Sequence, residues 1–203
     1  MLKVKIAVTL VAAGCWAFAQ DFNRWTFQGG VGPQFPLGGA HDRFNNGWDL
    51  MFGAGRNITK NFAALLEYHY DRSSLSGLEL ANANQPDGFN RFWSFTINPR
   101  YEFPIHGRWG AYGTGGYGIY SRRLAFTDPS LAQGYCDPYY GCYGTGAPIV
   151  AENTIHNGGV NFGGGVTWAL GESGLKVFTD VRYHRFLSHQ NIDFLEVSFG
   201  LKY

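Results

Sequence analysis

The feature that most constrains the fold is a two-residue alternation of apolar and polar side chains, which is clearest at the C-terminus. One face of this last stretch is apolar and consists of Leu195, Val197, Phe199, Leu201 and Tyr203. The other face is polar and consists of Glu196, Ser198, Gly200 and Lys202. Successive side chains of a β-strand point to opposite faces, so this pattern predicts a strand with one apolar face.

The same alternation recurs along the chain. It runs through residues 25–31, 48–54, 64–70, 93–103, 160–168 and 175–183, and more weakly through the glycine-rich stretch 109–121. With the C-terminal segment this gives eight strands of about ten residues, which is the length that a tilted strand needs to cross a bilayer. After residue 20 no apolar run is long enough for a membrane-spanning helix. Only helices and closed barrels satisfy every backbone group in lipid. The expected fold is therefore all-β: an eight-stranded antiparallel transmembrane up-and-down β-barrel.

The lengths of the connections support this topology. Three links are tight, at residues 56–61, 104–108 and 170–174, and three alternate with them and are long, at 36–47, 72–90 and 122–154. The last link, at 187–191, is short. Outer-membrane barrels have short periplasmic turns and longer extracellular loops, so the tight links are expected in the periplasm together with both termini.

The aromatic residues fit two membrane interfaces. Five fall near the periplasmic ends of their strands: Trp25, Tyr101, Trp109, Trp168 and Tyr203. Trp48 and Trp93 fall near the outer ends. Amphipathic rings prefer the headgroup region, so two girdles are expected. The alternative is a soluble lipocalin-like barrel, in which the apolar face would point inward.

The N-terminus has the features of a secretory signal peptide, expected to span residues 1–19, which leaves 20–203 as the barrel domain. Lys3 and Lys5 precede an uncharged apolar run, and Ala17-Phe18-Ala19 provides the small residues of a cleavage site. Lipidation at Cys15 is the less favoured alternative. Either interpretation predicts export from the cytoplasm.

The net charge and the context of one glycine-rich motif argue against nucleic-acid binding and dinucleotide binding. The net charge is only +1, without a polybasic segment, so no nucleic-acid partner is expected. The stretch Gly113-Thr114-Gly115-Gly116-Tyr117-Gly118 spells a dinucleotide fingerprint, but more strand follows it where a helix is required. We therefore expect no cofactor.

Charged residues fall on the face expected to line the barrel. They are Glu67, Arg100, Asp180, Arg182, Glu196 and Lys202. The short final hairpin places Arg182 opposite Glu196. Eight strands leave room only for side chains, and buried charges must be paired. A structural ion-pair network that fills the barrel is the favoured interpretation, and a gated proton or solute path is the alternative.

The third long loop contains Cys136 and Cys142 in the segment Cys-Asp-Pro-Tyr-Tyr-Gly-Cys. An even pair in an oxidising compartment favours a disulfide. Metal binding is the alternative, with Asp137 as the one nearby carboxylate. Aromatic contact candidates cluster around this pair: Tyr135, Tyr139, Tyr140 and Tyr143. Tyrosine offers large amphipathic area at low entropic cost, so this loop tip is the best candidate for a contact surface, with a solvated loop as the alternative.

Several segments carry a family resemblance over residues 20–203. They are Gly29-Gly30-Val31-Gly32-Pro33, Asn46-Gly47-Trp48, Gly53-Ala54-Gly55, Val181-Arg182-Tyr183-His184-Arg185 and Val197-Ser198-Phe199-Gly200-Leu201. The chain resembles the bacterial outer-membrane β-barrel proteins of the outer-membrane protein A type. The closing segment is also similar to the signal read by the barrel-insertion machinery, although it ends in Tyr203 rather than phenylalanine. The resemblance implies fold and location in the bacterial outer membrane, and no reaction.

The expected function is non-enzymatic: a role in envelope integrity, or surface recognition of an unknown ligand through the extracellular loops. The expected partners are outer-membrane lipid, lipopolysaccharide and the insertion machinery. One alternative is a lipid A hydrolase using His184, Ser188, His189 and Glu196 near the outer leaflet. Ser188 and His184 are four residues apart and His184 points inward, which argues against it. A narrow solute channel is the other alternative.

Overall fold

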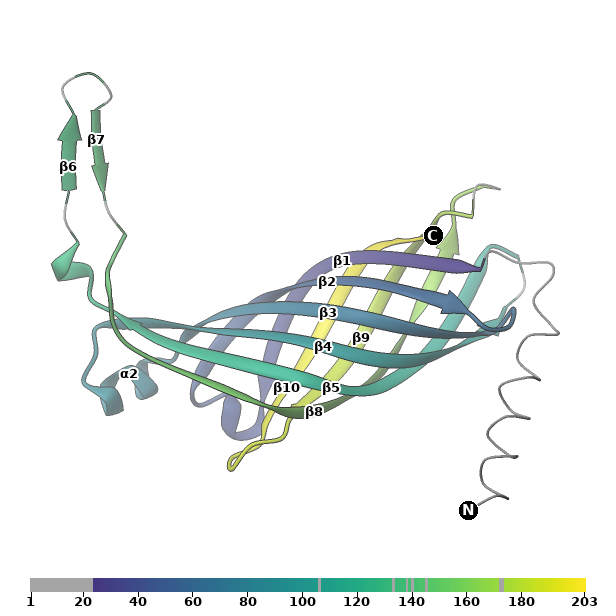
Figure 1. The fold of residues 1–203 in the computed structure, drawn as a ribbon, viewed down its shortest axis with the longest axis horizontal. Helices are drawn as coiled ribbons and strands as arrows, with labels where there is room; N and C mark the ends of the chain where they lie inside the picture. Colours follow the sequence, from purple (N-terminus) through teal and green to yellow (C-terminus); the bar gives the residue numbers. More distant parts are fainter. Residues whose placement is uncertain are drawn as a thin grey trace, which may run out of the picture.

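The computed structural model describes residues 24–203 except 106, 133, 138, 140, 145 and 172–173. Eight antiparallel strands close into a barrel in the order β1-β10-β9-β8-β5-β4-β3-β2 (Figure 1). The strands are β1 (Trp25–Leu37), β2 (Phe44–Asn57), β3 (Phe62–Leu75), β4 (Asp87–Pro104), β5 (Trp109–Thr127), β8 (Ile149–Ala169), β9 (Lys176–Phe186) and β10 (Ile192–Lys202). The predicted eight-stranded antiparallel barrel is confirmed. The expected signal peptide lies outside the described residues.

The first and last strands close the barrel. Their register runs from Gln28 opposite Lys202 to Leu37 opposite Asp193. At the end of this seam, Phe27 and Tyr203 exchange backbone hydrogen bonds of 3.0 and 2.8 Å. Closure leaves no unpaired strand edge, which is the condition for a β-structure in lipid.

The barrel wall is apolar outside and polar inside. Phe27, Leu66 and Phe199 are more than half exposed on the outer wall, whereas Glu67 and Glu196 are 0% and 1% exposed inside. This is the facing that the alternation predicts, and it is opposite to that of a soluble lipocalin-like barrel. Within the part of the chain that the structure describes, no helix is long and apolar enough to span a membrane.

The two ends of the barrel differ. The tight turns between β2 and β3, β4 and β5, and β8 and β9 lie at the same end as the C-terminus (Figure 1). The long connections and the short β9–β10 link lie at the other end. Strands β9 and β10 have 11 residues, in agreement with the expected length of about ten, whereas the other six strands are longer than expected, with 13 to 21 residues. The β5–β8 ladder continues to Thr127 opposite Ile149, since strand pairing beyond the lipid needs no apolar face.

The long connections contain short elements that the alternation did not predict. The first contains the 3-10 helix η1 (Gly38–Ala40), and the second contains the helix α2 (Gly77–Ala83), capped by Ser76 Oγ, which accepts from Glu79 N at 3.2 Å. The third contains the 3-10 helix η2 (Pro129–Leu131) and a hairpin of β6 (Gly134–Asp137) and β7 (Gly141–Gly144). This hairpin projects away from the barrel (Figure 1).

Candidate functional site

Glu67 is the centre of a buried polar network in the middle of the barrel. Its Oε1 accepts from Gln28 Nε2 at 2.6 Å and from Arg100 Nη2 at 3.2 Å. Its Oε2 accepts from Asn98 Nδ2 and Arg182 Nη1. These five side chains come from β1, β3, β4 and β9, and all are buried. The strand register brings them together because inward positions on neighbouring strands lie at the same height.

Arg182 carries the network to a second carboxylate. Its Nε and Nη2 each donate to Asp180 at 3.0 Å, and Tyr112 Oη donates to Asp180 Oδ2 at 2.6 Å. Arg182 lies opposite Glu196 in the β9–β10 ladder, as the final hairpin predicts, but the ion pairs recorded for it are with Glu67 and Asp180. Two guanidinium groups and two carboxylates therefore neutralise one another in this layer.

Glu196 belongs to a separate layer nearer the long loops. Its Oε2 lies 3.0 Å from His69 Nδ1 and 3.2 Å from His184 Nε2. The other nitrogen of His184 lies 2.9 Å from Tyr120 Oη. All four residues are at most 1% exposed. The layer thus combines a carboxylate with two imidazoles in the buried interior.

Three of these four residues, His69, His184 and Glu196, form the one cluster of possible metal ligands found among the described residues. Ligand atoms of His69, His184 and Glu196 lie within 4.8 Å of one another, and two histidines with a glutamate are a donor set that zinc accepts. In this arrangement both imidazoles instead face one carboxylate oxygen at ion-pair distance. Glu196 Oε1 and His69 Nε2 are buried in this cluster without a hydrogen-bond partner.

An apolar cluster lies inside the barrel at the long-loop end. Its buried members are Ala40, Phe44, Leu75, Phe92, Tyr120, Phe186, Ile192 and Phe194. The Phe92 ring lies 5.2 to 6.2 Å from three other phenylalanine rings, within the range of favourable aromatic pairing. Leu80 of α2 packs against the cluster. Apolar side chains therefore fill the interior between the charged layers and the long loops.

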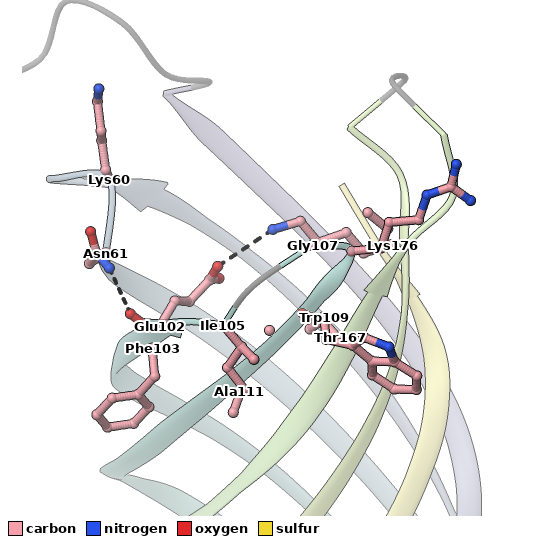
Figure 2. Close-up of a pocket in the computed structure, with 13 residues that line it drawn as sticks. Lys60, Asn61, Glu102, Phe103, Ile105, Gly107, Trp109, Ala111, Thr167 and Lys176 are labelled. Atoms are coloured by element: carbon pink, nitrogen blue, oxygen red, sulfur yellow. Dashed lines mark hydrogen bonds and ion pairs between the residues drawn. The ribbon is translucent and has the colours of Figure 1, made fainter.

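The opposite rim holds a pocket of about 370 Å³ (Figure 2). Lys176 Nζ lies 3.6 Å from Glu102 Oε2, and Asn61 Nδ2 donates to the Glu102 carbonyl at 2.9 Å. Lys202 Nζ pairs with Glu102 from inside the barrel. Glu102 thus ties three strands together at this rim.

These features belong to a known class of protein. The family model described as "Outer membrane protein beta-barrel domain" matches residues 6–203. The chain belongs to this outer-membrane β-barrel family. Its location is therefore the bacterial outer membrane. No curated protein matches the chain.

Solved structures agree with this assignment of the outer-membrane barrel. Neisserial surface protein A is 12% identical, with a TM-score of 0.58, over 88% of this chain and 95% of that one. A major outer membrane protein from Thermus thermophilus is 10% identical, with a TM-score of 0.50, over 89% of this chain and 99% of that one. At such low identity these likenesses establish the fold alone.

The residues expected inside this outer-membrane barrel separate into three groups. Glu67, Arg100, Asp180 and Arg182 meet in one layer, Glu196 lies in the next layer, and Lys202 lies at the rim. Sequence analysis did not single out five further participants: Gln28, His69, Asn98, Tyr112 and Tyr120. Each shares the inward face of its strand, so alternation contained the signal, but their partners lie on strands distant in sequence.

The loop candidates are described only in part. The backbones of Cys136 and Cys142 are directly opposed in the β6–β7 hairpin, as are those of Tyr135 and Tyr143, but these four side chains lie outside what the structure describes. Tyr139 is 92% exposed. Tyr140 lies outside the described residues, so the disulfide and the tyrosine surface remain predictions.

The structure does not assemble the residues considered for lipid A hydrolysis. Ser188 Oγ donates to the Gln190 carbonyl at 2.6 Å in the exposed β9–β10 link. His184 lies buried inside the barrel against Tyr120 and Glu196. A serine esterase needs the hydroxyl within hydrogen-bond reach of the imidazole. The described contacts give this reaction no support.

Proposed function

We propose that this protein is a non-conducting outer-membrane barrel that anchors an extracellular platform for surface recognition. The observation that most strongly supports this proposal is the filled interior of the barrel. Charged side chains bond to one another across the barrel, and an apolar cluster lies between them and the long loops. The proposal has two parts, a barrel without a pore and a platform outside the membrane, and each part has its own test.

The contents of the barrel support the absence of a pore. Arg100 and Arg182 are at most 1% exposed and share Glu67 as a partner. Opening a path would separate these ion pairs, and each unpaired buried charge costs several kcal/mol. A solute would also have to displace the aromatic rings around Phe92. A permanently filled barrel is the favoured state.

The extended β5–β8 ladder supports a recognition role. Its strands pair as far as Thr127 and Ile149, and Asp128 N donates to the Pro148 carbonyl at 3.2 Å at the base of the third loop. The ladder therefore carries the β6–β7 hairpin beyond the rest of the barrel (Figure 1). An extended arm that presents an exposed tyrosine is suited to contact a macromolecule rather than to support the barrel.

Liposome swelling tests the absence of a pore. Vesicles containing the folded protein should swell in small sugars no faster than protein-free vesicles. A general porin, reconstituted at the same molar ratio, provides the positive control. Swelling close to that of the porin would overturn this part of the proposal.

A variant without the β6–β7 hairpin distinguishes a role in surface recognition from a role in envelope integrity. In the test variant, a short glycine–serine link replaces residues 130–146 while Asp128 and Pro148 are kept. We expect the variant to fold and to restore detergent resistance to cells lacking the protein. We expect it to lose the attachment of those cells to host or abiotic surfaces. Loss of detergent resistance with unchanged attachment would instead favour an envelope-integrity role.

A further inference from the structure

Three arginines form a row across the outer wall near the long-loop end. Arg72 of β3 is directly opposed to Arg91 of β4, and Arg91 is directly opposed to Arg123 of β5. All three point outward, because directly opposed residues share a face and the strand neighbours Asp71 and Phe92 are buried inside the barrel. Like charges directly opposite each other destabilise a sheet, so this row needs anionic partners.

Only one of the three has a carboxylate partner in the described part of the chain. Arg123 Nε donates to Glu152 at 3.1 Å. Arg72 and Arg91 instead both lie over the ring of Phe89, with their guanidinium carbons 5.2 and 4.5 Å from its centroid. Arg91 Nε is buried without a hydrogen-bond partner. Two neighbouring guanidinium groups are therefore held in place with donor capacity left over.

The row lies at the height of the outer headgroups. Trp48 is directly opposed to Arg72, and Trp93 lies two residues from Arg91 toward the middle of the barrel. Tryptophan side chains mark the membrane interface, so the guanidinium groups lie at the polar edge of the outer leaflet. A surface pocket of about 480 Å³ beside Arg72 is lined by Trp48, Arg72, Asp87 and Phe89 among others.

We propose that Arg72 and Arg91 bind a phosphate group of a phosphorylated glycolipid headgroup in the outer leaflet. Guanidinium groups match phosphate oxygens with paired hydrogen bonds, and these charge-assisted bonds are stronger than neutral ones. Phosphate removes the repulsion between the two arginines. Trp48 and Phe89 offer apolar area to the adjoining acyl chains. This site lies on the barrel wall and does not depend on the proposed role of the loops.

The test uses the full folded protein in nanodiscs of zwitterionic phospholipid. Diphosphoryl lipid A is added, and the lipid A retained per chain is measured by native mass spectrometry. The variant Arg72→Gln/Arg91→Gln should retain about tenfold less lipid A, as expected for the loss of charge-assisted hydrogen bonds. The matched control Arg56→Gln/Arg108→Gln removes two arginines from the periplasmic end and should retain as much as the unmodified chain.

Two further measurements define which part of the lipid is bound. Lipid A without phosphate should be retained no better by the unmodified chain than by the double variant. Inorganic phosphate at millimolar concentration should not displace lipid A, since it lacks the acyl chains. Equal retention by both variants, equal retention of the dephosphorylated lipid, or displacement by inorganic phosphate would each overturn the proposal. A heat-modifiable gel shift verifies folding, and the single variants Arg72→Gln and Arg91→Gln replace the double variant if it does not fold.

Discussion

Asp49 of β2 and Asp71 of β3 are directly opposed in the antiparallel ladder, and both carboxylates point into the barrel. Ser198 Oγ donates to Asp49 Oδ2 at 2.9 Å, whereas the Oδ1 atoms of both aspartates lack a hydrogen-bond partner. Like charges in directly opposed positions destabilise a sheet, more so where water is excluded. This pair is therefore a weak point of the barrel interior.

Relief of this repulsion should stabilise the barrel. We expect Asp71→Asn to raise the free energy of unfolding by about 0.2–1 kcal/mol, because an amide relieves the repulsion between the two carboxyl groups and can donate to Asp49. Urea unfolding in lipid vesicles measures the change. The control Asp193→Asn breaks the 2.8 Å pair with Arg185 and should lower stability by about 0.2–1 kcal/mol. Any stability loss for Asp71→Asn would contradict the prediction.

Glu67→Gln should be strongly destabilising. The change leaves Arg100 and Arg182 with one negative charge fewer in a buried layer, at an expected cost of about 3–5 kcal/mol. Glu152→Gln, which breaks the exposed pair with Arg123, should cost at most about 1 kcal/mol. Both values come from the same urea series. Equal effects of the two changes would show that the Glu67 network contributes no more than a surface pair.

Phe92→Ala tests the apolar cluster. Loss of a buried ring that contacts Phe44, Phe186 and Phe194 should cost about 3–5 kcal/mol. The outward-facing control Phe199→Ala leaves no internal cavity, since this ring is 53% exposed, and its effect should be clearly smaller. Liposome swelling should stay at the protein-free level for both variants, because the charged layers remain. Rapid swelling with Phe92→Ala would indicate that the cluster alone blocks the barrel.

Gly32 should not tolerate a side chain. A Cβ at this inward position of β1 would lie 1.9 Å from the backbone carbonyl oxygen of Val197, which cannot move without disturbing the seam that closes the barrel. Gly32→Ala should therefore reduce the folded fraction in a heat-modifiable gel shift. Gly39→Ala is the control, since a Cβ there meets no atom within 4 Å. A folded fraction unaffected by Gly32→Ala would show that the seam can shift.

The opposed backbones of Cys136 and Cys142 make the predicted disulfide testable by mass spectrometry. Without reduction, alkylation should leave both residues unmodified, and after reduction both should be labelled. The chain-entropy model gives a stabilisation of roughly 2 kcal/mol for so small a ring, confined to the hairpin. Labelling of both cysteines in the unreduced protein would exclude the bond.

The alternation of apolar and polar residues along the sequence determines the number of strands and the facing of side chains such as Leu66 and Glu67. The gaps between these alternating segments determine which connections are tight and which are long. These properties are local: whether a residue points inward depends only on its position along its own strand. Strand ends were less predictable. The β5–β8 ladder continues where the lipid no longer selects apolar residues, so residues 149–154 carry no clear pattern of alternation.

Sequence alone thus determined the barrel, its facing and its location in the outer membrane. Only the tertiary structure decided the partners: Arg182 with Glu67 rather than Glu196, the two histidines with Glu196, and Arg72 beside Arg91. The physical reason is that ion pairs form between side chains at the same height in a closed barrel. Height depends on the register of every strand and on the length of each side chain, and neither is written in the spacing of residues along the sequence.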